Sequence, residues 1–242
     1  MLMPTRCPVC GVAGPAPCDR CRAVMWAAGP VPPPPGLDEC RSFLVYAGAA
    51  RAVITRFKYR NDRAVLRWLA DGMAGLLTPP PGAVVTWAPT ATRRRRVRGF
   101  DQAELLAVAV ARRWGASCVP LLVRRGGGAQ TGRSRGERRA NAVLASRAAP
   151  GHGGPSVALT AGDRPPVVVI DDVLTTGATL SASATALRAT GVPWVGAVTA
   201  ARTPAHATHG KSDVVSPRSV SDEPPVVEES LKFARFRADD ER

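Results

Sequence analysis

The sequence predicts an α/β protein built around a parallel sheet. Short runs of branched apolar residues alternate along the chain with longer segments of helical period, which is the pattern of parallel strands joined by crossover helices. The clearest run is Val167–Ile170, and four consecutive apolar residues are typical of a strand buried on both faces. A cysteine- and proline-rich region precedes this pattern and a polar region follows it, so we expect three regions, 1–36, 37–202 and 203–242.

The individual elements follow from apolar periodicity and from the residues that begin and end them. Expected strands cover 43–46, 83–88, 118–123, 167–170 and 194–200, and expected helices cover 48–59, 64–77, 101–114 and 180–188. In the first helix Val53, Ile54 and Phe57 share one face, and Gly115 ends the third helix. Segment 124–136 is rich in Gly and Arg and is expected to be mobile, and 137–145 is expected to form a helical turn. The low hydrophobicity and mixed charge of 203–242 predict disorder.

The charge distribution predicts a polyanionic partner. The chain has 33 Lys+Arg against 19 Asp+Glu, and from Arg93 to Arg139 there are 13 Arg against three acidic residues. Such a segment suits pyrophosphate or nucleic acid, although a solvated basic face would have the same composition. No run approaches the roughly 18–20 apolar residues of a membrane span, and Met1–Cys10 lacks an apolar signal region, so we expect a cytoplasmic protein without membrane insertion.

Two Cys-x-x-Cys pairs, Cys7 with Cys10 and Cys18 with Cys21, predict a zinc-binding module in region 1–36. Four thiolates leave no open position for water, which favours a structural Zn²⁺, and a redox-active dithiol is the alternative. The region is too short and too rich in Pro and Gly to form its own apolar core, so the metal would supply folding energy. The polyproline run Pro30–Gly36 is expected to hold this module away from the main domain.

The residues after Val167–Ile170 predict a site for a phosphorylated sugar. Asp171 and Asp172 are expected to end the strand, and because carboxylates repel phosphate they suit sugar hydroxyls or a hydrated Mg²⁺. A loop at the start of a helix can hold a phosphate through backbone N–H groups, aided by the helix dipole. The loop residues expected around the phosphate are Val173, Leu174, Thr175, Thr176, Gly177, Ala178 and Thr179. The alternative is a strand–turn–helix whose polar residues only cap the helix.

Three further strings extend this pattern. They are Phe57-Lys58-Tyr59, the run Arg95-Arg96-Val97-Arg98-Gly99-Phe100-Asp101-Gln102, and Gln130, Arg138 and Asn141 at spacings of eight and three. Together with the cysteine pairs and the acidic loop, they make residues 5–202 resemble the ComF family of competence-associated, phosphoribosyltransferase-like proteins. The resemblance implies a type I phosphoribosyltransferase fold, a central parallel sheet flanked by helices, with a small N-terminal zinc-knuckle module.

The resemblance also implies a ligand and residue roles. The ligand would be 5-phosphoribosyl-1-pyrophosphate (PRPP) with Mg²⁺, and the reaction would transfer the phosphoribosyl group to an acceptor that the sequence does not identify. Asp171 and Asp172 would contact the ribose, and Arg96 and Arg98 would stabilise the departing pyrophosphate. Two further PRPP-binding residues would be Thr90, in the loop that holds pyrophosphate, and Arg138, where a mobile segment returns to the core.

Some residues depart from the family pattern, and two other functions remain open. The family's Pro-Val-Pro is here Trp87-Ala88-Pro89, and Asp101 stands where the family has Asn, at a position that suits a helix cap. One alternative is a single-stranded-DNA-binding protein that assists DNA uptake, although the basic segment has only Phe100 and Trp114 as aromatic residues. The other is a PRPP sensor without catalysis. A homo-oligomer is compatible with each function.

Overall fold

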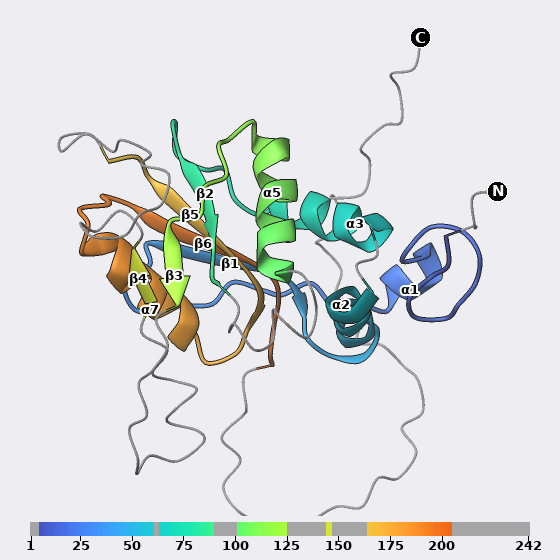
Figure 1. Cartoon of the computed structure of the whole chain (residues 1–242). Coiled ribbons are helices and arrows are strands. Elements are labelled where there is room, and N and C mark those ends of the chain that lie inside the picture. Colours follow the sequence, from blue (N-terminus) through green and yellow to red (C-terminus); the bar gives the residue numbers. More distant parts are fainter. Residues whose placement is uncertain (1–4, 61–62, 90–100, 125–143, 147–163, 205–242) are drawn as a thin grey trace, which may run out of the picture. The chain divides into compact units, whose positions relative to one another are not determined.

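The computed structural model describes residues 5–60, 63–89, 101–124, 144–146 and 164–204. In this part of the chain the fold is α/β, with a four-stranded parallel sheet of order β1-β6-β5-β2 flanked by helices (Figure 1). The strands are β1 (Glu39–Val45), β6 (Val195–Arg202), β5 (Val167–Leu174) and β2 (Val84–Trp87). The predicted α/β class with a parallel sheet is therefore confirmed.

Both outer edges of the sheet are covered by irregular segments. At β1, Val45 N–H donates to Trp26 O at 2.9 Å and Ala28 N–H donates to Phe43 O at 3.0 Å. At β2, a parallel bridge joins Val85 to Cys118. Because an open strand edge invites pairing with another chain, these segments protect the sheet.

Helices and a small antiparallel pair of strands cover the two faces of the sheet. Three helices, α2 (Gly48–Arg60), α3 (Arg63–Ala74) and α5 (Gln102–Trp114), belong with one apolar core. The other core is closed by α7 (Ala178–Arg188) and by the antiparallel pair β3 (Leu122–Arg124) and β4 (Leu144–Ser146) (Figure 1). The face predicted for the first helix is confirmed, since its three apolar residues are fully buried.

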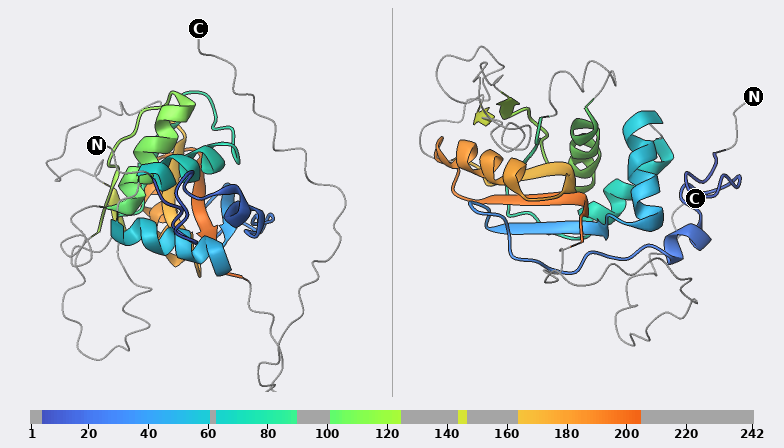
Figure 2. Two further views of the ribbon diagram at one scale, coloured as in Figure 1. Left: turned by 90° about the vertical axis from the view of Figure 1, so that its right-hand side faces the viewer. Right: turned by 90° about the horizontal axis from the view of Figure 1, so that it is seen from below.

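The N-terminal segment packs against the main domain, contrary to the expected spacer. Ala16 is buried in the core formed with α2 and α3, and Val9 and Met25 pack against it. The short helix α1 (Asp19–Ala23) lies beside α2 and α3, and the Arg22 guanidinium lies 5.8 Å from the centre of the Trp68 ring (Figure 2). The spacer prediction is wrong because burying these apolar side chains against the main domain stabilises the protein more than leaving them in water would.

Several boundaries also differ from the sequence prediction. Strand β1 begins at Glu39, four residues early, and β3 begins at Leu122 because the residues from Ser117 to Val119 pair with β2 instead. Residues 144 and 145, expected in a helical turn, belong to β4, which pairs with β3. Among the described residues, no helix is both long and apolar enough to cross a membrane. The region 203–242 lies outside the described residues beyond Pro204.

Candidate functional site

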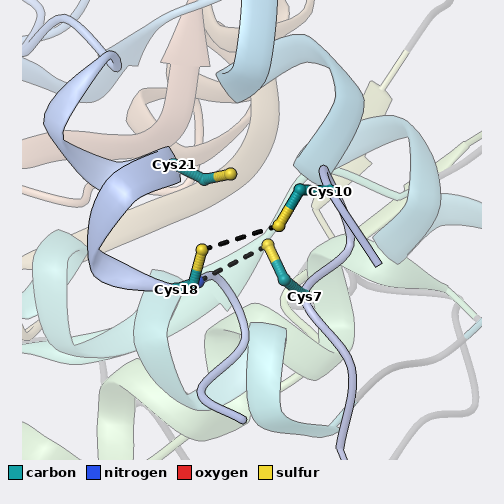
Figure 3. A group of neighbouring side chains, drawn as sticks. All are labelled: Cys7, Cys10, Cys18 and Cys21. Carbon is teal, nitrogen blue, oxygen red and sulfur yellow. Dashed lines mark hydrogen bonds between the residues drawn. The ribbon is translucent and has the colours of Figure 1, made fainter. Parts of the chain in front are cut away.

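The four N-terminal cysteines converge on one point and can hold a metal ion. The sulfur atoms of Cys7, Cys10, Cys18 and Cys21 all lie within 4.8 Å of one another (Figure 3). Tetrahedral Zn–S bonds of about 2.3 Å would separate two ligand sulfurs by about 3.8 Å. The Cys10 and Cys18 sulfurs are 3.7 Å apart, so the arrangement suits a structural metal such as zinc.

Hydrogen bonds and burial give these thiols different affinities for protons. Burial raises the pKa of Cys7, but hydrogen bonds led by that from the Cys10 backbone outweigh it and lower the pKa to about 6. Burial and the neighbouring sulfurs raise the pKa of Cys21 to about 12. When a metal ion binds, the thiols release their protons to solvent, because the cation offsets the repulsion among four thiolates.

The acidic pair lies within a strand rather than after it. Strand β5 continues through Leu174, with Asp171 beside Thr199 and Leu174 beside Arg202 of β6. The prediction that the carboxylates end the strand is wrong because β6 provides hydrogen-bonding partners along this length. The carboxyl end of β5 still leads into α7, which places the acidic pair and the loop at the edge where parallel α/β sheets bind ligands.

Residues from two other elements surround the acidic pair. The ammonium group of Lys58 in α2 lies 3.0 Å from Asp172 Oδ2. Gln102, the first residue of α5, donates from Nε2 to Lys58 O at 2.9 Å. Asp101 caps α5 by accepting from Ala103 N–H at 3.2 Å, which confirms its expected role as a helix cap. The site thus draws on β5, α2 and the beginning of α5.

The carboxyl group of Asp171 is strongly perturbed. Burial, the charge of Asp172 and the charge of Asp101 raise its pKa from 3.8 to about 8, against the lowering effects of the Asp172 N–H and of Lys58. The Asp172 N–H donates to Asp171 Oδ1 at 2.8 Å. Carboxylates so close together attract cations and hydroxyl donors, and a cationic ligand would favour their ionised form.

The turn between β5 and α7 ends in a left-handed glycine at the start of a helix. Gly177, the N-cap of α7, has φ +77° and offers no side chain to cap the helix. Thr176 Oγ1 accepts from Ala178 N–H at 3.4 Å, and the Thr175 and Thr176 side chains are exposed. A phosphate at this helix start would meet backbone N–H groups and hydroxyls together. The helix begins at Ala178, two residues before the expected start.

The structure places only part of the predicted constellation. It places Asp171 and Asp172 beside the turn 175–177 and the first residues of α7, Ala178 and Thr179, whereas Val173 and Leu174, expected in the loop, belong to β5. Thr90, Arg96, Arg98 and Arg138 lie outside the described residues. Lys58 was part of a recognised string but had no expected role. Its contact with Asp172 was missed because only the folded chain brings together residues 114 positions apart.

Comparison with known proteins does not identify the chain. No protein-family model matches it, and no curated protein matches it.

Proposed function

We propose that the protein binds PRPP with Mg²⁺ at the carboxyl end of β5. The observation that carries the proposal is the continuous run of a buried strand, two adjacent carboxylates, a threonine-rich turn and a helix whose N-cap is a left-handed glycine. A sugar phosphate requires acceptors for its hydroxyls and donors for its phosphate. The acidic pair supplies the first, and the turn and helix start supply the second.

The same arrangement supports phosphoribosyl transfer by a type I phosphoribosyltransferase-like domain. The bond from ribose C1 to the pyrophosphate oxygen would break, and a bond from C1 to a nucleophilic atom of the acceptor would form as that atom loses a proton. Positive charge develops on the ribose, and the carboxylates of Asp171 and Asp172 would favour it. Arg96, Arg98, Thr90 and Arg138 are proposed to bind the departing pyrophosphate on the basis of the sequence alone.

Bound Mg²⁺ would neutralise the pyrophosphate charge, and the cysteine centre would have a structural role. Oxygen donors such as the acidic pair suit Mg²⁺, directly or through water. The four cysteines would hold a structural Zn²⁺, since four thiolate ligands leave no open position on the metal for a substrate or water.

Calorimetric titration of the wild-type chain and of an Asp171→Asn/Asp172→Asn variant with PRPP, with and without Mg²⁺, tests the proposal. We expect the wild type to bind PRPP with a dissociation constant on the order of 1 μM, and only in the presence of Mg²⁺. We expect the variant not to bind PRPP. Equal affinities for the two proteins would contradict the ribose contact.

A sensor that binds PRPP without turning it over would give the same titration and no product with any acceptor. The single-stranded-DNA alternative rests on the segment from Arg93 to Arg139, and ten of its 13 arginines lie outside the described residues. A steep dependence of DNA affinity on salt would support it, since each neutralised phosphate releases counterions.

A further inference from the structure

We propose that Lys58 is a positioning residue of this site, which holds the Asp172 carboxylate in the orientation that ribose hydroxyls require. The inference rests on the proposed function. It assigns a role to the end of α2, a helix that is remote in sequence from both the acidic pair and the threonine loop.

The contact between Lys58 and Asp172 is short and partly shielded from water. Lys58 Nζ lies 3.0 Å from Asp172 Oδ2, and the two side chains are 19% and 21% exposed. An ion pair in this setting is stronger than one at a fully exposed surface, because the surrounding medium screens it less. Lys58 therefore restricts the rotation of the Asp172 side chain.

The two neighbouring carboxylates are held by different donors. The Asp172 N–H binds Asp171 Oδ1 at 2.8 Å, and the Lys58 ammonium binds Asp172. When a bound cation favours the ionised form of both carboxyl groups, like charges this close repel each other. Without the ammonium group this repulsion would be uncompensated, and the Asp172 carboxylate would turn toward water and away from its ligand-binding orientation.

Lys58 is itself fixed by neighbouring elements. It lies in the last turn of α2, where carbonyl groups lack an intrahelical donor, and fully buried Gln102 donates to its carbonyl oxygen at 2.9 Å. The Tyr46 ring, whose centre is 6.0 Å from Lys58 Nζ, adds a cation–π contact. The end of α2 thus contacts α5, β5 and Tyr46, the residue that follows β1, and the ammonium group is held in place before any ligand binds.

A positioning role and a direct contact with pyrophosphate make different predictions. If Lys58 acts through Asp172, its loss weakens the binding of every ligand that contains the ribose and leaves the binding of pyrophosphate unchanged. If it binds the diphosphate directly, pyrophosphate affinity falls as well. Ribose 5-phosphate and inorganic pyrophosphate therefore separate the two roles.

The test is calorimetry with Mg²⁺ and three probes: PRPP, ribose 5-phosphate and inorganic pyrophosphate. The variants are Lys58→Met, which removes the charge, and Lys58→Arg, which keeps it. The control is Arg41→Met, which changes the net charge equally but breaks the 2.9 Å pair of Arg41 with Glu39, near the opposite end of β1. Circular dichroism and thermal unfolding verify that each variant is folded.

We expect Lys58→Met to lower the affinities for PRPP and ribose 5-phosphate about tenfold, as for the loss of one charge-assisted contact. Its affinity for pyrophosphate should stay within about twofold of the wild-type value. Lys58→Arg should retain affinity to within about threefold, and Arg41→Met should match the wild type. Recovery by arginine shows that the charge is what matters, since a purely structural defect would lower the melting temperature without selecting among the ligands.

Three results would overturn the inference. In the first, Lys58→Met binds ribose 5-phosphate as the wild type does, while the wild type binds PRPP, so only the positioning role fails. In the second, Lys58→Met loses pyrophosphate affinity to the same extent. In the third, the wild type binds none of the probes, which removes the proposed function as well. If Lys58→Met does not fold, Lys58→Gln replaces it, and equal affinities of the Gln and Arg variants for ribose 5-phosphate would overturn the role.

Discussion

Replacing Gly177 by alanine tests how closely the proline-rich segment packs against the proposed phosphate loop. Gly177 has φ +77°, and a Cβ at this position would lie 2.8 Å from Pro34 Cγ and 3.0 Å from Pro34 Cβ. The left-handed conformation costs alanine about 1–2 kcal/mol. Overpacking against Pro34 adds about 1–3 kcal/mol, so we expect the free energy of unfolding to fall by about 2–5 kcal/mol.

Gly115→Ala is the matched control. Gly115 ends α5 with φ +62°, and an added Cβ would meet no atom within 4 Å. This variant carries only the backbone cost, so the difference between the two substitutions isolates the Pro34 contact at about 1–3 kcal/mol. In a Pro34→Ala background the cost of Gly177→Ala should shrink, because the atom at 2.8 Å is gone.

Urea unfolding followed by tryptophan fluorescence measures the free energies of unfolding of the wild type and of the four variants, including the Gly177→Ala/Pro34→Ala double variant. If Gly177→Ala is no more destabilising than Gly115→Ala, the proline segment does not pack on the loop as described. If the cost of Gly177→Ala is unchanged by Pro34→Ala, the strain has another origin.

Three further predictions concern the metal, the acidic pair and the core. The wild type should contain about one zinc ion per chain, and Cys18→Ser should lose it while Cys40→Ser, outside the cluster, keeps it; elemental analysis that finds no metal in the wild type would contradict the site. Because the pKa of Asp171 is raised to about 8, native protein holds a proton that the unfolded chain has lost above about pH 4, so stability should fall as pH rises from 4 to 8. In urea unfolding at a series of pH values, Asp171→Asn should reduce the dependence of the free energy of unfolding on pH. An unchanged pH dependence would mean that a group other than Asp171 causes it. Phe57→Ala, at a fully buried position, should lower the free energy of unfolding by about 3–5 kcal/mol, and a loss below about 1 kcal/mol would contradict its place in the core.

Apolar periodicity predicted most elements because each of them depends on nearby residues. The helix at 48–60, its three buried residues and the glycine that ends α5 all follow from local spacing and capping. The lengths of the strands were harder to predict from the sequence. Strand β5 runs past Ile170 because β6 lies beside it as far as Arg202, and polar residues such as Asp171 continue a strand when a neighbour supplies the hydrogen bonds.

Contacts between distant segments were the part that the sequence did not reveal. The cysteine spacing predicted four converging thiols, and the structure brings their sulfurs together. Nothing in the local pattern indicated that Arg56 would donate to Pro8 O at 3.4 Å, or that Pro34 would lie against Gly177. These contacts turn an expected spacer into a packed segment, and they depend on tertiary burial rather than on the stiffness of a proline run.

The most direct test of the proposed site is an NMR titration of isotope-labelled protein with PRPP and Mg²⁺, read at assigned backbone amides. We predict that the amide signals from Thr175 to Thr179 shift most, together with those of Asp171 and Asp172, because the phosphate and the ribose would contact these residues. Saturating PRPP that leaves these signals unmoved, or that shifts only amides elsewhere in the chain, would contradict a phosphoribosyl site at the carboxyl end of β5.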